Sequence, residues 1–337
     1  MKAVIFEEYG PPDVLQVKEI QKPTPKDIEV LIKVHAAEVT KADCEMRSFN
    51  FQVKWFWLPL RIALGLIKPR KQVLGGYFSG EVESVGKDVS KFKQGDQIFG
   101  ITKLRFGAYG EYICLPSNYT LVPKPHNVSF EEAAAIPLGG LNALHFLNKA
   151  NIQKGEKVLV NGAGGSIGTF GVQIAKAMGA EVTAVDSAIK EKMLRRIGAD
   201  HFFDYSKEDF TKSGQIYDVI FSMVAQSPYK ECVRILNPKG RYLMANPRLL
   251  DMLRSVVTSR FTDKSAIFAF AEEKEEELLA LKAMIEEGKI KPVVDKVYSL
   301  EQAAEAHQRV ETEQRLGAII ISVAQVNCIR TKSDTSS

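Results

Sequence analysis

The sequence predicts an α/β protein built from a partial β-barrel and a doubly wound parallel sheet. The first third of the chain reads as short strands separated by glycines, which is typical of a compact all-β unit. After Pro125 strands and helices alternate, and the strand cores at 158–160 and 182–185 are continuously apolar or β-branched. Such strands suit a parallel sheet that is covered on both faces. The length of 337 residues also favours two domains over one.

Within the all-β part, residues Glu29 to Val39 alternate between apolar and other side chains. This period-two pattern predicts a half-buried strand with one apolar face, made by Val30, Ile32, Val34 and Ala36. We expect further strands at 2–6, 79–85, 96–99 and 109–115.

In the second part, Ser129 followed by Glu132 is a capping-box signature for a helix. Further helices are expected at 137–150, 167–178 and 190–197, with strands at 157–161, 181–185, 201–204, 218–222 and 241–245. The charged stretch from Glu272 to Glu287 predicts a helix with one apolar face, made by Leu278, Leu281 and Ile285. A strand near 297, a helix from 300 and a strand at 318–322 follow, and the polar tail at 325–337 is expected to be disordered.

Composition narrows the function classes. The chain carries 45 basic and 41 acidic residues, a net charge of +4, which gives no footprint for a nucleic-acid partner. The four cysteines are too widely spaced for a disulfide framework or a structural zinc site, so we expect reduced thiols and a cytoplasmic location. The N-terminus runs directly into a strand pattern and shows no signal peptide.

The segment from Phe49 to Ile67 is apolar and aromatic, yet it carries Lys54 and Arg61 and is broken by Pro59. A membrane-spanning helix needs about 20 mostly apolar residues, so we predict no span. A loop and short helix over an apolar pocket is the preferred interpretation. Peripheral contact with a lipid surface is the alternative, because Trp, Phe, Lys and Arg together suit a membrane interface.

The most informative segment is a glycine-rich turn between a strand that ends at Asn161 and a helix that begins near Ile167. Its residues are Gly162, Ala163, Gly164, Gly165, Ser166, Ile167 and Gly168. Glycines allow a tight turn and let backbone amides approach a diphosphate, and the helix N-terminus favours an anion. Asp186 ends the next strand, where a carboxylate can accept hydrogen bonds from ribose hydroxyls. The order of strand, turn, helix, strand and acid predicts a dinucleotide-binding site.

The same turn resembles that of the zinc-independent quinone oxidoreductases, a family of the medium-chain dehydrogenase/reductase superfamily. The stretch from Gly155 to Lys176 is similar to their signature, although the family usually has a second glycine at Ser166. Further similar stretches are Gly95 to Gly100, Gly110 to Tyr112, Gly198 to Tyr205, Pro238 to Arg241 and Gly288 to Ile290. The similarity covers about residues 1–324.

This resemblance implies a fold, a cofactor and an assembly. It implies a GroES-like catalytic domain at 1–124 and 269–324, interrupted by a Rossmann nucleotide-binding domain at 125–268. It also implies a nicotinamide cofactor, NADH or NADPH, a small hydrophobic substrate and a homodimer joined through the nucleotide-binding domains.

The resemblance also bears on metals. Zinc-bearing relatives hold a catalytic zinc with a Cys, a His and a second Cys, and the first two ligands would fall at Thr40 and Gly76. Neither residue is a normal zinc ligand, so we predict neither a catalytic nor a structural zinc. Without that Lewis acid, a conjugated acceptor is easier to reduce than a plain ketone, since its developing charge delocalises.

Several residues are candidates for the substrate pocket by the same resemblance. Thr40 lies where many relatives have an Asn near the nicotinamide, and Tyr77 lies where many have an Asp. Tyr77 is either a hydrogen-bond donor to the substrate oxygen or a packed residue at the rim of the core. Asn142 either binds the nicotinamide carboxamide or only packs. Trp55 to Trp57 form either an apolar lid or ordinary core.

The sequence favours NADH and NADPH about equally as the cofactor. Asp186 favours NADH because its charge would repel a 2′-phosphate. Ser187, Lys190 and Tyr205 match positions that bind this phosphate in NADPH-dependent relatives, although Lys190 is equally consistent with a solvated helix charge. Arg315 is a further candidate for the nucleotide site.

The predicted function is hydride transfer from NAD(P)H to a quinone or an α,β-unsaturated carbonyl. An enoyl-thioester reductase is a close alternative. A nucleotide-binding sensor or structural protein that has lost turnover is an alternative of a different class, suggested by the departures at Thr40, Gly76, Tyr77 and Ser166.

Overall fold

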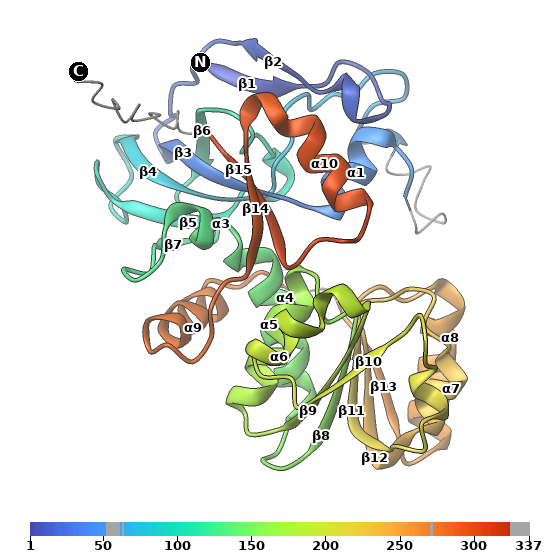
Figure 1. The fold of residues 1–337 in the computed structure, drawn as a ribbon. Helices are drawn as coiled ribbons and strands as arrows, with labels where there is room; N and C mark the ends of the chain where they lie inside the picture. The colour runs from blue at the N-terminus through green and yellow to red at the C-terminus, as the bar shows by residue number, and fades with distance from the viewer. Residues whose placement is uncertain (52–60, 63, 270–271, 324–337) are drawn as a thin grey trace, which may run out of the picture.

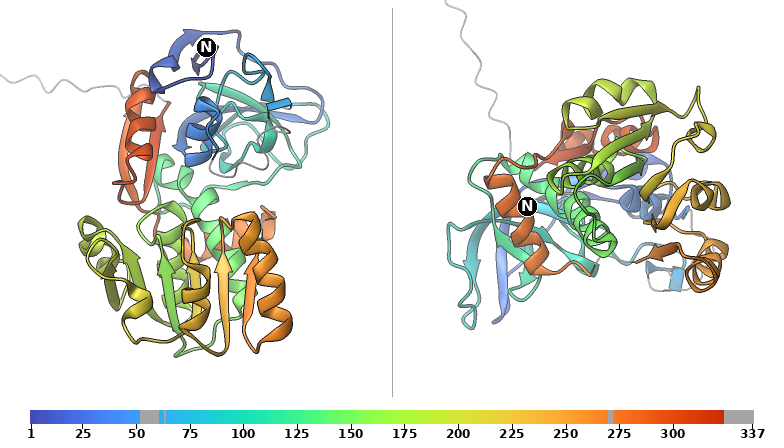
Figure 2. Two further views of the ribbon diagram at one scale, coloured as in Figure 1. Left: turned by 90° about the vertical axis from the view of Figure 1, so that its right-hand side faces the viewer. Right: turned by 90° about the horizontal axis from the view of Figure 1, so that it is seen from below.

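A computed structural model describes residues 1–51, 61–62, 64–269 and 272–323. These residues form two stacked parts, an upper one rich in antiparallel strands and a lower one with a parallel sheet (Figure 1). In Figure 2 the N-terminal strands lie at the end of the molecule farthest from the parallel sheet. No described helix is long and apolar enough to cross a membrane.

The upper part contains a seven-stranded sheet in the order β14-β15-β3-β4-β5-β7, with β6 also paired to β3, and a separate β1–β2 pair. Strands from both ends of the chain share this sheet, since β15 runs antiparallel to β3. The strands are β1 Lys2–Ile5, β2 Gln16–Glu19, β3 Glu29–Val39, β4 Tyr77–Val85, β5 Gln97–Ile101, β6 Tyr112–Pro116, β7 Leu121–Pro123, β14 Val294–Ser299 and β15 Ala318–Ser322.

The central strand β3 departs from the predicted pattern. Val30, Ile32 and Val34 pack in one core, but Ala36 packs on the other side, against Ala318 and Ile320. The cause is a bulge at His35, because Val34 pairs with Gly80 while Ala36 pairs with the adjacent Ser79. One extra residue reverses the in–out phase of a strand. The prediction that Ala36 shares the face of Val34 is therefore wrong.

The lower part contains six parallel strands in the order β10-β9-β8-β11-β12-β13, a doubly wound topology. Val158 and Val160 of β8 face the core under α4 and α5, while Leu159 faces the core under α7. This alternation confirms the predicted α/β class. The strands are β8 Lys157–Asn161, β9 Glu181–Asp186, β10 His201–Asp204, β11 Tyr217–Ser222, β12 Leu236–Met244 and β13 Ser265–Phe268.

Helices connect and cover the two sheets. The α-helices are α1 Lys41–Ser48, α3 Phe130–Ala134, α4 Ile136–Ala150, α5 Ser166–Ala177, α6 Glu191–Arg196, α7 Tyr229–Arg234, α8 Leu249–Phe261, α9 Glu275–Glu286 and α10 Ala303–Glu311. Short 3-10 helices are η1 Pro12–Val14, η3 Lys103–Arg105, η4 Ala188–Lys190, η5 Phe210–Lys212 and η6 Leu300–Gln302. The predicted apolar face of α9 is confirmed, since Leu278, Leu281 and Ile285 are buried.

Helix α8 lies where the sequence analysis placed no helix. It buries the polar residues Asp251, Ser255 and Thr258 against the sheet. Its large apolar side chains point outward and are 52% to 75% exposed, namely Leu249, Leu250, Leu253, Val256, Val257 and Phe261. This inverted amphipathicity leaves a large apolar surface on the outer face of the lower part.

Part of the aromatic segment from Phe49 to Ile67 lies among the described residues. Phe49 is buried, its ring packs edge-on against Tyr9, and the Arg61 guanidinium lies over both rings. Ile67, by contrast, is 84% exposed. The proposed lid residues at 55–57 and the tail at 325–337 lie outside the described residues.

Candidate functional site

The glycine-rich turn after β8 adopts the shape that the sequence predicts. Gly162 has a φ of +85°, which favours glycine. A Cβ atom at Gly168 would lie 2.3 Å from the Gly162 carbonyl oxygen, so the helix can pack onto the turn only without a side chain there. Helix α5 begins at Ser166, and no described side chain caps its N-terminus at Gly165. The helix dipole and backbone amides are thus directed toward the turn.

Asp186 lies beside this turn at the end of β9. Its Oδ2 accepts a hydrogen bond from the Gly164 amide at 2.7 Å, and its Oδ1 accepts one from the Ser187 amide at 2.8 Å. The Nζ of Lys190 lies 2.9 Å from Oδ1, and both side chains are buried. The carboxylate is therefore neutralised by a lysine and fully engaged at this edge of the sheet.

Arg315 comes to the turn from the other end of the chain. The Gly317 amide donates to the Gly164 carbonyl oxygen at 2.9 Å, and Gly165 and Gly317 form a parallel bridge. This contact holds the Arg315 Nη2 3.9 Å from the position that a Cβ on Gly165 would occupy. The Nε and Nη1 atoms of Arg315 are buried and have no hydrogen-bond partner among the described residues.

These features together fit the diphosphate of a dinucleotide. A partly buried guanidinium with two unpaired donor atoms beside an uncapped helix N-terminus offers charge and N–H groups to an anion. The glycine turn, Ser166 and Arg315 would hold the diphosphate, and the placement of Asp186, Ser187 and Lys190 at the adenosine ribose stays a prediction. Tyr205 joins this group through its backbone, since its amide donates to the Asp186 carbonyl oxygen, and its side chain is 63% exposed.

Thr40 is buried at the N-cap of α1 in the upper part. It forms a capping box, in which its hydroxyl donates to the Asp43 carboxylate at 2.6 Å and accepts from the Asp43 amide. The Asp43 carboxylate also accepts from the Gly75 amide, and burial raises its pKa. In this arrangement the Thr40 hydroxyl is committed to shaping the start of the helix.

Tyr77 begins β4, and its hydroxyl donates to the Glu273 carboxylate at 3.4 Å. Burial and the nearby carboxylates raise the pKa of the Tyr77 hydroxyl, so it stays protonated near neutral pH. A neutral phenol beside the nucleotide-binding part is a hydrogen-bond donor. The long distance to Glu273 leaves it able to exchange this partner for another acceptor.

The amide of Asn142 points back to its own helix. Its Nδ2 donates to the Leu138 carbonyl oxygen of α4 at 2.9 Å. This contact corresponds to the packing alternative of the sequence analysis, and a role toward a carboxamide stays a prediction.

No group of three or more metal-ligating side chains is found in the part of the chain that the structure describes. Cys44 pairs with His307, whose Nδ1 lies 3.4 Å from the thiol sulfur. Burial raises the pKa of Cys44 and lowers that of His307 to about 3, so neither group is charged near neutral pH. The absence of zinc stays a prediction from the residue types at Thr40 and Gly76.

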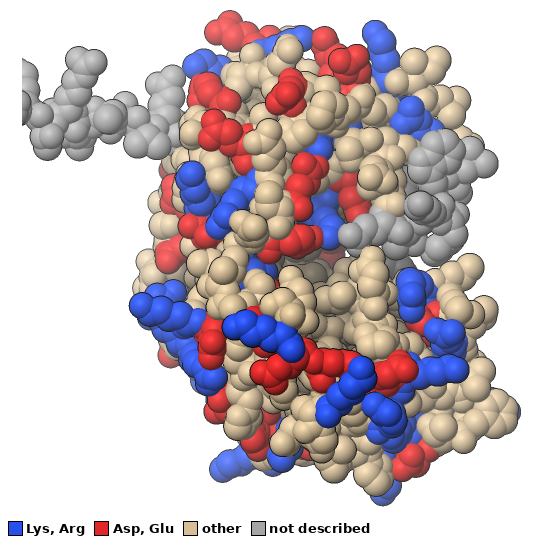
Figure 3. Space-filling model, turned by 45° about the vertical axis from the view of Figure 1, so that its right-hand side comes forward, with Lys and Arg blue, Asp and Glu red and all other residues tan. Residues whose placement is uncertain are grey.

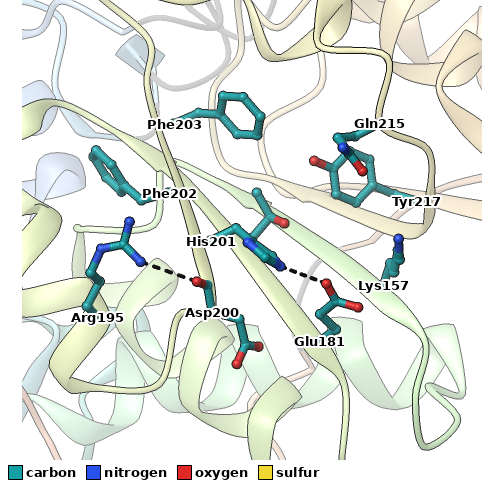
Figure 4. Close-up of a pocket in the computed structure, with 10 residues that line it drawn as sticks. Lys157, Glu181, Arg195, Asp200, His201, Phe202, Phe203, Gln215 and Tyr217 are labelled. Carbon is teal, nitrogen blue, oxygen red and sulfur yellow. Dashed lines mark hydrogen bonds and ion pairs between the residues drawn. The ribbon is translucent and has the colours of Figure 1, made fainter.

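A surface pocket of about 340 Å³ lies at the amino ends of the parallel strands, away from the glycine-rich turn (Figure 4). It is lined by the first residues of four neighbouring strands, Lys157, Glu181, His201 and Tyr217. Doubly wound sheets bind ligands at the carboxyl ends of their strands, and these are the amino ends. His201 and Glu181 already pair with each other at 2.7 Å, so we interpret these residues as structural and do not assign a ligand to the pocket.

Sequence analysis missed three acidic residues near the site, Glu38, Asp43 and Glu273. The Thr40-x-x-Asp43 spacing carries a recognisable capping signal. Glu38 is fully buried on β3, and its carboxylate accepts from the Ser166 hydroxyl at 2.6 Å. Its position could not be anticipated, because the bulge at His35 sets the direction in which it points.

Comparisons with known proteins agree with this fold. Residues 26–126 match the alcohol dehydrogenase GroES-like domain, and residues 197–321 match a domain described as zinc-binding dehydrogenase. The quinone oxidoreductase of Homo sapiens is 30% identical over 92% of this chain and 94% of its own length. The NADPH-dependent alkenal/one oxidoreductase of Arabidopsis thaliana is 30% identical, over 95% and 79%. The solved quinone oxidoreductase of Coxiella burnetii superposes with a TM-score of 0.85 at 28% identity, over 96% and 99%.

The fold thus defines an NAD(P)-dependent oxidoreductase with a GroES-like domain and a Rossmann domain. We call the glycine-rich turn, Ser166 and Arg315 the dinucleotide cradle. The chain belongs to the quinone oxidoreductase family of the medium-chain dehydrogenase/reductase superfamily.

Replacing Arg315 tests the assigned cradle. We expect Arg315→Met to weaken the binding of reduced nicotinamide dinucleotide by about 10- to 100-fold, because a hydrogen bond to a charged group contributes ~1.5 to 3 kcal/mol. The measurement is titration of cofactor fluorescence. Arg309→Met is the matched control, since Arg309 pairs with Asp295 instead. Unchanged affinity in a folded Arg315→Met variant would contradict the assignment.

Proposed function

We propose that this chain transfers hydride from NADPH to a conjugated acceptor, either a quinone or an α,β-unsaturated carbonyl. The observation that carries the proposal is Arg315, whose buried, unpaired donors lie beside the uncapped N-terminus of α5. The names of the relatives, quinone oxidoreductase and alkenal/one oxidoreductase, support this class of acceptor. When bound, the nicotinamide would supply the hydride, and the protein's residues would position it and the acceptor.

A conjugated acceptor also suits the residues around the cleft. Thr40 and Gly76 predict that no zinc polarises the substrate oxygen, so a hydrogen-bond donor must stabilise the developing enolate. Tyr77 is a neutral phenol with a weak partner in Glu273, and we assign it this role. Thr40 would act as a positioning residue, since its hydroxyl holds Asp43 at the start of α1.

The decisive experiment measures NADPH oxidation with a panel of small quinones and enones. Turnover on these acceptors, with little on saturated ketones, is the expected result. Tight nucleotide binding without turnover on any acceptor would instead favour the sensor or structural protein.

The role of Tyr77 is tested in the same assay. We expect Tyr77→Phe to lower kcat by about 100-fold, because general acid assistance typically contributes 10²- to 10⁴-fold, and to leave NADPH affinity unchanged. Tyr112→Phe is the control, since the ring of Tyr112 contacts Lys22 on the outer surface. An unaltered kcat in Tyr77→Phe would remove Tyr77 from the mechanism.

We further propose that NADPH is preferred over NADH. Lys190 neutralises Asp186, and both oxygens of that carboxylate are already engaged, which weakens its repulsion of a 2′-phosphate. The Ser187 and Tyr205 amides both donate to Asp186, so the two residues lie beside this pair, where we propose that they contact the phosphate.

Lys190→Met should therefore raise the KM for NADPH by about tenfold, corresponding to ~1.4 kcal/mol, and affect NADH less. The loss of the ammonium both removes a partner for the phosphate and leaves Asp186 without its ion-pair partner. Lys192→Met on the exposed side of α6 serves as control. Equal effects on both cofactors would argue against a role for Lys190 in the discrimination.

We also propose a homodimer formed through the lower part. Strand β13 pairs on one side with β12 and is the last strand of the sheet in the described chain. The apolar outer face of α8 lies next to it, since Ser259 hydrogen-bonds to Ala266. An edge strand beside an exposed apolar helix favours isologous association. The cytoplasmic location stays a prediction from the cysteine spacing.

Light scattering after size exclusion should show a dimer for the wild type and a monomer for Leu253→Glu, because a charge on the α8 face would be desolvated in the interface. Leu279→Glu, a similarly exposed leucine on α9, should stay dimeric. A monomeric wild type would leave a lipid surface as the alternative partner of α8, which vesicle co-sedimentation measures.

A further inference from the structure

Glu38 is a carboxylic acid with no exposure to solvent, placed behind the dinucleotide cradle. Its Oε1 accepts a hydrogen bond from the Ser166 hydroxyl at 2.6 Å. Its Oε2 is buried and has no partner among the described residues. An ionised carboxylate with one unsatisfied oxygen is costly in such a place. Burial accordingly raises the pKa of Glu38 to about 8, although Ser166 and Arg315 both act to lower it.

The groups that face Glu38 come from every element around it. Ser166 belongs to α5, Arg315 to the segment before β15, Asp43 to α1 and Tyr77 to β4, with the Tyr109 hydroxyl nearby. Asp43 opposes ionisation of Glu38, and Arg315 is the only cation among these neighbours. Burial raises the pKa values of Tyr77 and Tyr109, so both phenols are neutral throughout the physiological range.

The positive charge of Arg315 can therefore stabilise either of two anionic groups. One is the Glu38 carboxylate behind the turn, and the other is the diphosphate that the cradle would hold in front of Gly165. Glu38 itself lies in a low-dielectric interior, where a second negative charge nearby is strongly unfavourable. Ser166 connects the same two groups. Its hydroxyl is hydrogen-bonded to Glu38, and it is also the first residue of the helix that would face the phosphates.

We propose that the chain binds a dinucleotide with Glu38 in its protonated form, so that an ionised Glu38 takes up one proton on binding. Protonation converts the carboxylate to a neutral acid and removes its repulsion of the diphosphate, so that the charge of Arg315 acts on the phosphates alone. The step adds one proton from solvent to one Glu38 oxygen and involves no oxidation or reduction. This inference rests on the proposed nucleotide site and adds proton linkage to it.

This linkage predicts that the affinity for the dinucleotide falls as the pH rises. Below about pH 8 most Glu38 is already protonated in the free protein, so affinity hardly changes with pH. Above that pH the proton must be acquired on binding, and the Kd rises by up to about tenfold per pH unit. The phosphates of NADPH are fully ionised above neutrality, so they do not produce this slope.

The test is calorimetric titration of the full chain with NADPH between pH 7 and 9.5. We expect a nearly constant Kd up to about pH 8 and a weakening of about tenfold between pH 8.5 and 9.5. At pH 8.5, titrations in two buffers of different ionisation enthalpy should reveal the uptake of most of one proton. This proton count needs no variant.

Two variants assign the proton to Glu38. Glu38→Gln, which is always neutral, should bind with a flat pH profile and no proton uptake. Ser166→Ala should move the break to higher pH, because the Ser166 hydrogen bond lowers the pKa of Glu38. Glu273→Gln, which removes a different carboxyl whose pKa burial also raises, should keep the wild-type profile.

Two results would overturn the proposal. One is wild-type binding with no proton uptake at pH 8.5, and the other is a Glu38→Gln profile as steep as that of the wild type. Failure of the proposed function is a separate outcome, since the wild type would then bind no nicotinamide dinucleotide at any pH.

Discussion

The two sheets meet where the glycine-rich turn after β8 pairs with the chain just before β15. The Gly317 amide donates to the Gly164 carbonyl oxygen at 2.9 Å, and a Cβ atom on Gly317 would lie 2.3 Å from the Val293 carbonyl oxygen, so this position also favours glycine. This backbone contact joins the parallel sheet to the barrel-like sheet, together with the hydrogen bond from Ser166 of α5 to Glu38 of β3. Arg315, two residues earlier, is directed at the phosphate-binding turn as a consequence.

Charged side chains lie at two places around the glycine-rich turn. Toward the ribose end, Asp186 and Lys190 neutralise each other and are bound to the turn's own backbone. Behind the turn, Glu38 and Arg315 each have buried polar atoms without a hydrogen-bond partner among the described residues. Elsewhere, acidic and basic side chains are interspersed, as the surface face in Figure 3 shows. We therefore expect selective anion recognition to depend on this buried arrangement, since the net charge of +4 supplies little.

The upper part supplies the groups that would meet the substrate. Thr40 and Asp43 secure the start of α1 through their capping box, and Tyr77 stands at the start of β4 with a neutral hydroxyl. Both depend on the register of β3 and β4, because the bulge at His35 sets the phase of every residue after it. A change of register by one residue would turn Glu38 away from the cofactor and expose the strand's apolar side chains.

The sequence by itself determined the doubly wound sheet, the phosphate-binding turn and the acid at the end of β9. These follow from local patterns, since glycine spacing, apolar runs and strand–helix alternation act within about 30 residues. The tertiary structure decided what those patterns leave open. It placed Arg315 and Glu38 at the turn from distant parts of the chain, paired Asp186 with Lys190, and turned the polar face of α8 inward. Such contacts depend on strand register and sheet packing, which no local periodicity encodes.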